Sequence, residues 1–218
     1  MAAQNLAETA SDGAALLRNE PVQARSTARL AGLLDAAAAI IDEIGYERLT
    51  TAMVAERAGA SIGTVYRYFP DRIVVLQSLS ARFLQTFVER ANAAVRDPAH
   101  ATWADAISAV IDTIVDAFRS EVGYRSLRLG DVLDIRPAAS AHPGTAVVAE
   151  TIAAGLAERF ALPAKDLALR VEVVLDVADA LLSRAFAHDR GGDERFITEA
   201  RSIVRDYLVS VYGEPVAG

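Results

Sequence analysis

Apolar residues recur at helical spacing from about residue 26 onward. The first such stretch ends at Ile44 and is followed by Gly45, a position where glycine commonly closes a helix. Spacings of three, four and seven residues place its apolar side chains on one face, which predicts a helix from Ser26 to Ile44. The residues of that face are Leu30, Leu33, Leu34, Ala37, Ile41 and Ile44.

Two short helices are predicted next. Thr50 and Thr51 are suited to cap the first of them, which stops at Gly59. Ser61 is suited to cap the second, which runs to about Tyr68. With the preceding helix they make three helices of about 19, 8 and 7 residues, the last two joined by a tight link. This order is typical of a helix-turn-helix.

The pattern stays helical beyond this point. Asp71 is placed to cap a long fourth helix, and later helical stretches cover residues 103–118, 144–160, 164–188 and 193–212. Residues 124–135 are not assigned to an element, and the two prolines and the glycine of 136–144 indicate a loop. Because no stretch alternates like a strand and nothing repeats, we predict an all-α protein of about nine helices.

The composition limits the cellular locations and the kinds of catalytic or metal-binding site that are possible for this protein. Hydrophobic residues make up 52% of the 218 residues, yet no run approaches the roughly 18 apolar residues of a membrane span. The N-terminus lacks the basic start and apolar core of a secretory signal. The absence of cysteine excludes disulfides, thiolate metal sites and a cysteine nucleophile. These features fit a cytoplasmic protein that has no membrane partner.

The net charge of −7 does not by itself favour a nucleic-acid partner. The charge is unevenly spread, however. Residues 21–72 hold six arginines and six acids, so this segment is neutral and the negative charge lies elsewhere. From Arg57 to Arg72 there are three arginines and one acid. An acidic protein therefore presents a local basic edge in its predicted helix-turn-helix.

The segment from Glu56 to Arg72, ERAGASIGTVYRYFPDR, has the chemistry of a DNA-reading helix. Small residues at its front permit close approach to a groove, and Ser61 is placed to cap the helix and to meet a phosphate or a base. Thr64 and Arg67 lie three residues apart on one face, within reach of base edges, and arginine is the usual partner of guanine. Taken alone, the neighbouring tyrosines would be interpreted as core aromatics.

This segment and the residues before it resemble the TetR family of bacterial transcriptional regulators. The residues that carry the resemblance are Gly45-Tyr46, Thr50, Val54-Ala55, Ala58-Gly59-Ala60-Ser61, Gly63, Val65-Tyr66, Tyr68-Phe69 and Arg72. The resemblance implies a homodimer that binds a palindromic operator in double-stranded DNA, most often as a repressor. It also implies a C-terminal domain whose small-molecule effector changes the spacing of the two DNA-reading heads. We expect no enzymatic activity and no cofactor.

By position, the resemblance assigns DNA contacts to ten residues. They are Thr50, Thr51, Ser61, Ile62, Gly63, Thr64, Tyr66, Arg67, Tyr68 and Arg72. Many members have a basic residue where this chain has Ile62, so an apolar contact with a thymine methyl would replace one charge. Arg25 and Arg29 are candidates for further phosphate contacts, and solvated surface arginines are the simpler interpretation of both.

The resulting division is a mobile N-terminal arm (residues 1–20), a helix-turn-helix DNA-binding domain (21–72) and a helical ligand-binding and dimerisation domain (73–218). Candidate effector-pocket residues are apolar side chains whose default role is core packing: Phe83, Phe87, Trp103, Ile107, Phe118, Tyr124 and Phe186. Candidate dimer contacts lie on the last two predicted helices: Val171, Leu175, Leu182, Ile203, Tyr207 and Val211. Arg125 and Arg128 are either solvated or placed to meet an acidic effector.

Other functions are compatible with parts of this sequence. An activator or a ligand-independent regulator would share the same fold, and an all-α enzyme is the rival from another class. Ser183, Asp179 and His188 suggest a hydrolase, but nothing gives the serine a strained turn or an oxyanion hole. His100 and His142 are far in sequence from His188, so we expect no metal site.

Overall fold

The computed structural model describes residues 25–127 and 144–215. Within these ranges the chain forms eight α-helices and one 3-10 turn and contains no strand, which confirms the all-α prediction. The predicted arm, Arg128 and His142 lie outside the described residues. The N-terminal helix covers residues 25–44. It is followed by η1 (Tyr46–Arg48), α2 (Thr51–Arg57), α3 (Ile62–Tyr68), α4 (Arg72–Arg96), α5 (Trp103–Ser120), α7 (Gly144–Phe160), α8 (Leu167–Ala185) and α9 (Glu194–Tyr212).

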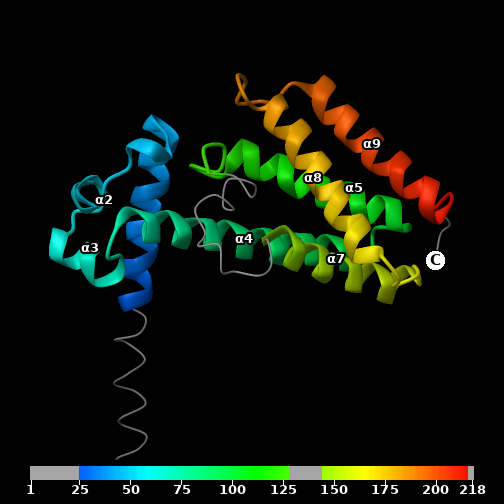
Figure 1. Ribbon diagram of the computed structural model, residues 1–218, viewed down its shortest axis with the longest axis horizontal. Helices are drawn as coiled ribbons and strands as arrows, with labels where there is room; N and C mark the ends of the chain where they lie inside the picture. The colour runs from blue at the N-terminus through cyan, green and yellow to red at the C-terminus, as the bar shows by residue number, and fades with distance from the viewer. Residues whose placement is uncertain (1–24, 128–143, 216–218) are drawn as a thin grey trace, which may run out of the picture.

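The helices form two groups joined by α4 (Figure 1). The N-terminal helix, η1, α2, α3 and the first turn of α4 make a small bundle, hereafter the head, at one end of the molecule. From there α4 runs into the second group, where it packs against α5 and α7. In that group α8 packs between α7 and α9, and α8 and α9 form an outer layer (Figure 1). No helix in the described ranges has both the length and the apolar character needed to span a membrane.

Side-chain caps begin the helices of the head where the sequence predicts them. The oxygens of Thr50, Ser61 and Asp71 accept backbone N–H groups three residues later, at 3.2, 3.1 and 3.0 Å. Each bond satisfies a donor that the first turn of a helix leaves unpaired, and a cap of this kind is worth about 1 kcal/mol. The caps therefore fix where α2, α3 and α4 start.

The turn between α2 and α3 depends on Gly59. This residue has φ +57°, in the left-handed region that glycine occupies without strain. The N–H of Ala60 donates to the carbonyl of Ala55 at 2.9 Å, and the N–H of Gly59 donates to that of Glu56 at 3.2 Å. This pair of bonds is a Schellman motif, which ends α2 and turns the chain directly into α3.

The head is held together by one apolar core. On the N-terminal helix, Leu33 and Ile41 of the predicted face are fully buried. Val65 of α3 and Phe69, the C-cap residue of α3, are also buried, and their spacing of four places them on one face. Burying each such side chain contributes about 1.5–3 kcal/mol. Because α3 commits Val65 and Phe69 to this core, its opposite face is left toward solvent.

Contacts beyond α4 also connect the head to the second group. The turn formed by residues 121–127 lies against the N-terminal helix. Within this turn, Gly123 has φ +83°. A Cβ atom at Gly123 would lie 2.8 Å from the carbonyl oxygen of Ala38. Arg82 of α4 also pairs with Asp35 of the N-terminal helix, at 2.6 Å. The head is therefore attached to the second group at more than one place, including α4 and the 121–127 turn.

Candidate nucleic-acid interface and internal cavities

The solvent face of α3 carries an unusual set of exposed side chains. Tyr66 is 53% exposed and Ile62 is 43% exposed, although both have large apolar parts. Arg67 is also exposed, and within the described part of the chain it makes no hydrogen bond or ion pair. A guanidinium held on a helix with all its donors available is suited to bidentate contact with a guanine edge or a phosphate.

The start of α3 is rigid because its polar groups bind one another. The Oγ of Ser61 accepts the N–H of Thr64 at 3.1 Å and lies 2.9 Å from the Thr64 hydroxyl. Thr64 is half-buried, while Ser61, Ile62 and Gly63 are exposed. The predicted DNA contact of Thr64 therefore comes from a hydroxyl that is already oriented by the cap of its own helix.

The two tyrosines of α3 differ in their surroundings. The hydroxyl of Tyr68 lies 3.1 Å from the Ser26 hydroxyl on the N-terminal helix, and its ring is half-buried. The hydroxyl of Tyr66 lies 3.5 Å from the Oγ1 of Thr51 on α2, which is a long contact. Since a hydroxyl both donates and accepts, each tyrosine retains hydrogen-bonding capacity toward a phosphate while remaining tied to a neighbouring helix.

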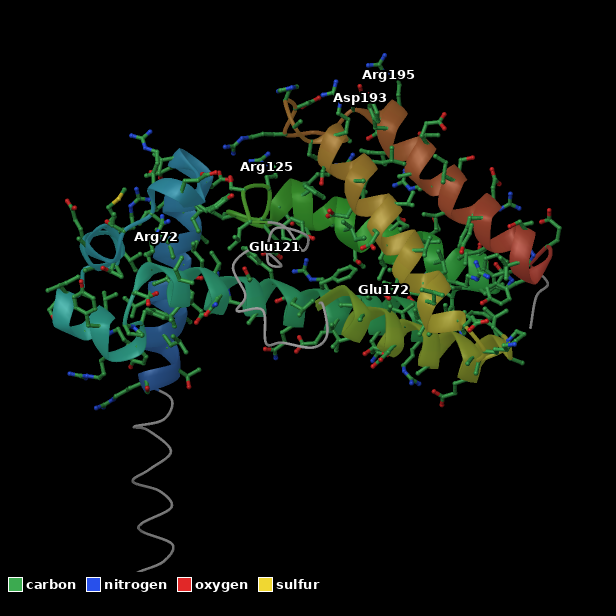
Figure 2. All side chains as sticks on the ribbon, viewed as in Figure 1. Arg72, Glu121, Arg125, Glu172, Asp193 and Arg195 are labelled. Carbon is green, nitrogen blue, oxygen red and sulfur yellow. The ribbon has the colours of Figure 1, made fainter. Side chains whose placement is uncertain are left out.

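Arg72 has a contact inside the head that its sequence position does not indicate. Its Nη1 donates to the backbone carbonyl of Glu47 in η1 at 2.7 Å. Figure 2 shows Arg72 within the head, where the first turn of α4 meets the earlier helices. Arg72 therefore joins two elements of the head, and any phosphate contact would use its remaining donors.

Two other arginines of the head are placed differently from each other. Arg57 of α2 makes two hydrogen bonds with Glu43 of the N-terminal helix, at 2.8 and 2.7 Å. The side-chain hydrogen bond and the charge of Arg57 lower the pKa of Glu43, although both groups lie at the surface. By contrast, Arg29 lines a concave region of about 420 Å³ between the N-terminal helix and the turn after α2. That region is bounded by Arg25, Ala28, Arg29, Gly32, Leu33 and Ala58.

The seven predicted pocket residues are all buried, but they do not surround one cavity. Phe83, Phe87 and Tyr124 enclose a space of only about 10 Å³ and act as core. Trp103 and Ile107 line a cavity of about 250 Å³ where α5 faces α9. The sequence identified apolar side chains of the right kind but could not assign them to a common space.

Phe118 and Phe186 line a third cavity, of about 530 Å³. Their rings are stacked, with centroids 4.8 Å apart and planes at 5°. The edge of Phe118 also meets Tyr124, which in turn meets Phe83, at centroid distances of 5.2 and 5.5 Å. Aromatic side chains therefore connect this cavity to the centre of the second helix group.

Of the six candidate dimer residues, three are buried, two are exposed and Tyr207 is half-buried, with its hydroxyl accepting a hydrogen bond from Arg170 at 2.7 Å. Val171, Leu175 and Leu182 of α8 are at most 5% exposed within a single protomer, so they are core residues and supply no surface to a partner. Ile203 and Val211 of α9 are 43% and 41% exposed. The spacing had placed the apolar residues of α8 correctly on one face, but that face packs against α7 and α9. Exposed apolar residues that were not predicted are Leu169 and Val173 on α8.

Catalytic and metal-binding groups are not brought together in the described ranges. The Oγ of Ser183 is buried and makes no hydrogen bond there, so it lacks the contact with His188 that a serine nucleophile needs. No group of three or more metal-ligating side chains occurs among the residues described.

A capped helix-turn-helix with an exposed second helix, attached to a separate helical group, defines a DNA-binding transcriptional regulator. Comparison with known proteins gives the family. The sequence pattern of "Bacterial regulatory proteins, tetR family" matches residues 33–77, and that of "Tetracyclin repressor-like, C-terminal domain" matches residues 101–212, about half of the chain. The chain belongs to the TetR family. It is therefore a DNA-binding regulator and not an enzyme.

Individual relatives agree with this assignment. The crystal structure of a TetR-family transcriptional regulator from Streptomyces coelicolor is similar, with a TM-score of 0.70 and 31% identity over 84% of this chain and 99% of that one. Nucleoid occlusion factor SlmA of Actinobacillus pleuropneumoniae is 32% identical over 91 residues, which are 42% of this chain and 44% of SlmA. The HTH-type transcriptional repressor KstR of Rhodococcus jostii is 46% identical over 50 residues, 24% of KstR. The chain thus spans less than half the length of these two curated relatives.

Proposed function

We propose that this protein is a repressor that binds a palindromic operator as a homodimer and is released when a small molecule occupies its C-terminal domain. The observation that carries the proposal is the solvent face of α3, where Arg67 is exposed and unpaired among the described residues beside a Tyr66 that is 53% exposed. Exposed aromatic surface promotes unspecific association between protein molecules, so its presence on α3 favours a binding role for this face.

The side chains of the head suggest a division of labour on DNA. Arg67 would read a base edge in the major groove, and Ile62 would contact a thymine methyl. Tyr66 and Tyr68 would bind phosphates through their hydroxyls, and Arg25 and Arg29 would follow the backbone beside the concave region that they line. Thr50, Thr51, Ser61, Gly63, Thr64 and Arg72 complete the proposed contact set.

The proposed dimer uses the outer layer made by α8 and α9 (Figure 1). On α9, Ile203, Tyr207 and Val211 are spaced by four residues and so lie on one face. On α8, Leu169 and Val173 have the same spacing. They are exposed, as are Ile203 and Val211, whereas Tyr207 is half-buried. A two-fold interface would bury these rows against their copies, and it would set the distance between the two heads.

Release by a small molecule follows from linkage between the two groups of helices. A ligand that binds better to a conformation with the wrong head spacing lowers operator affinity by its differential affinity for the two conformations. The repressor assignment takes support from KstR, whose name is that of a transcriptional repressor. A regulator acting on a bacterial operator would reside in the cytoplasm.

Selection of DNA from a random pool by the purified protein tests the proposal. Sequencing should reveal an enriched inverted repeat, with half-sites separated as two heads of one dimer require. Arg67→Ala protein, checked for a wild-type circular dichroism spectrum, should enrich the repeat poorly or not at all. Enrichment of a single half-site would contradict the dimer, and no enrichment at low salt would contradict operator binding itself. Reporter expression from the enriched site then decides between repression and activation.

A further inference from the structure

The cavity beside Phe118 and Phe186 lies where the second helix group meets the N-terminal helix. Its volume of about 530 Å³ is enough for a drug-sized molecule. Four segments supply its walls: the N-terminal helix, the end of α5 with the turn after it, the end of α8, and the loop that follows α8. Figure 2 shows Arg125 on the turn after α5, between the head and the α8–α9 end of the molecule. The lining residues are Asp42, Phe118, Arg125, Ser126, Ser183, Phe186, Ala187, His188, Asp189 and Arg190.

One carboxylate in this cavity is shared between two guanidinium groups. Asp42 accepts a hydrogen bond from Arg125 at 3.3 Å through Oδ1 and one from Arg190 at 3.1 Å through Oδ2. Charge-assisted bonds between such groups are usually 2.7–2.9 Å long, as in the two bonds between Arg57 and Glu43. Both bonds of Asp42 are therefore longer than optimal. The Asp42 and Arg125 side chains are only 17% and 19% exposed, so water does little to solvate them.

The polar groups of the cavity wall have more donors to offer than acceptors. Among the described residues, Arg125 and Arg190 each use one terminal nitrogen, on Asp42, out of the five N–H groups of a guanidinium. One oxygen of Asp189, Oδ1, accepts the N–H of Gly191 at 2.8 Å. The Oγ of Ser183 is buried and has no hydrogen-bond partner in the described part of the chain. Such a wall favours a guest that accepts hydrogen bonds.

An apolar surface lies beside these donors. Phe118 and Phe186 border the same cavity with stacked rings. They are only 2% and 4% exposed, so each offers a guest a small part of its ring. A guest that fits both the guanidinium donors and the phenylalanine rings has an anionic end and an apolar body. The anionic end accepts bidentate hydrogen bonds, and the body is aromatic or aliphatic. A carboxylate matches the geometry of a guanidinium in this way.

We propose that the cavity beside Phe118 and Phe186 binds an organic carboxylate. This carboxylate replaces Asp42 as the hydrogen-bond acceptor of the Arg125 and Arg190 guanidinium groups. The carboxylate of the guest replaces that of Asp42 on the same donors, its apolar body rests on Phe118 and Phe186, and the Ser183 hydroxyl donates to it. The proposal names the chemical class of the effector, and to that extent it rests on the proposed function.

Binding of a guest in this cavity also affects how the DNA-binding head is positioned. Asp42 belongs to the N-terminal helix, and the next residue, Glu43, binds Arg57 of α2. When Arg125 and Arg190 turn to the guest, the N-terminal helix loses its two ion pairs through Asp42. It keeps its attachment through α4 and the packing of the 121–127 turn at Gly123. The guest therefore favours conformations in which the head is less firmly positioned, and it lowers operator affinity to that extent.

Isothermal titration of the full-length protein without DNA tests the site. The probes are benzoate, 2-naphthoate and decanoate, each paired with its neutral primary amide. At least one carboxylate should bind, and its amide should bind about tenfold more weakly or not at all, as expected for lost charged hydrogen bonds. Arg190→Gln should weaken the carboxylate by a smaller factor, several-fold, because the Arg190 side chain is 77% exposed and water screens its bond. The matched control is Arg195→Gln, which removes an arginine that is 87% exposed and lies outside the cavity; it should change nothing.

Asp42→Asn gives the most specific readout because it removes the internal competitor. Carboxylate affinity should rise several-fold in this variant, whereas a purely structural role for Asp42 would leave it unchanged or lower it. The proposal is wrong if no carboxylate binds the wild-type or the Asn protein, if amides bind equally well, or if Arg190→Gln has no effect. A carboxylate that binds here but leaves affinity for the selected operator unchanged would overturn the coupling. Failure to bind any operator without ligand would instead contradict the proposed function.

Discussion

Asp42 and Glu43 are adjacent residues whose carboxylates bind opposite parts of the molecule. Asp42 accepts hydrogen bonds from Arg125 and Arg190 of the second helix group. Glu43 accepts hydrogen bonds from Arg57 of α2 in the head. Both acids lie in the last turn of the N-terminal helix, which ends at residue 44. A conformational change in either group of helices can therefore be transmitted to the other group through this turn.

The pair of Glu43 and Arg57 makes the head sensitive to acid. Arg57 lowers the pKa of Glu43 below its ordinary value of 4.5, so the pair stabilises the fold above that value and the contribution is lost as the pH falls through the lowered pKa. In Glu43→Gln protein this acid-dependent loss should be absent, and stability should vary less with pH below about 4.5. Urea denaturation at a series of pH values from 3 to 7 measures the difference. Parallel curves for the two proteins would show that the pair contributes nothing.

Gly123 should be intolerant of a side chain for two separate reasons. Its φ of +83° disfavours other residues, and an added Cβ atom would lie 2.8 Å from the carbonyl oxygen of Ala38. Gly59 has a positive φ as well, but a Cβ there would meet nothing within 4 Å. We expect Gly59→Ala to cost about 1–2 kcal/mol of unfolding free energy. Gly123→Ala should cost about 1–3 kcal/mol more through the steric clash.

Urea denaturation of the two alanine variants gives the comparison directly. Equal losses of unfolding free energy would mean that the 121–127 turn shifts away from the N-terminal helix at little cost. A larger loss for Gly123→Ala would confirm that this attachment of the head is tightly packed.

Arg72→Ala should affect both stability and DNA binding. Removing the bond to the Glu47 carbonyl should lower the unfolding free energy by about 1 kcal/mol. If a remaining donor of Arg72 also binds a phosphate, operator and scrambled DNA should both bind more weakly, and the slope of log affinity against log salt should flatten by about one unit. Fluorescence anisotropy titrations at several salt concentrations measure that slope. An unchanged slope with lowered stability would restrict Arg72 to its structural role.

Ile203→Asp should convert the proposed dimer into a monomer. The side chain is 43% exposed in one protomer, so the aspartate should not disturb the protomer fold, but it would leave a buried unpaired charge in an interface on α9. Ile73→Asp is the matched control, since Ile73 is 37% exposed and lies at the start of α4, far from α8 and α9 (Figure 1). Light scattering with size-exclusion chromatography should give a monomer for the first variant and the wild-type mass for the second. A wild-type mass for both would place the interface elsewhere.

Local features of the fold were predictable because they depend on neighbouring residues. The caps at Ser61 and Asp71, the glycine turn at Gly59 and the burial of Val65 and Phe69 all follow from spacing and residue type within one or two turns. These features define the head, and with it the solvent face of α3.

The features that were missed depend on contacts between distant parts of the chain. Nothing near Arg125 in the sequence indicates that it meets Asp42, 83 residues earlier, or that Arg190 joins them. Similarly, the spacing of Val171 and Leu182 identifies an apolar face of α8 without saying whether it packs inside the protomer or against a copy. Which buried aromatic residues border a cavity is also decided by how whole helices pack.

The central claim is that Arg67 on the exposed face of α3 reads the operator, and an anisotropy titration tests it most directly. Wild-type and Arg67→Ala proteins are titrated with the enriched site and with a scrambled site of the same composition at one salt concentration. The wild type should prefer the enriched site by at least about a thousandfold. Arg67→Ala should lose about 1–3 kcal/mol on the enriched site and much less on the scrambled one. Equal losses on both sites would show that Arg67 contributes charge alone, and no preference in the wild type would contradict sequence-specific recognition.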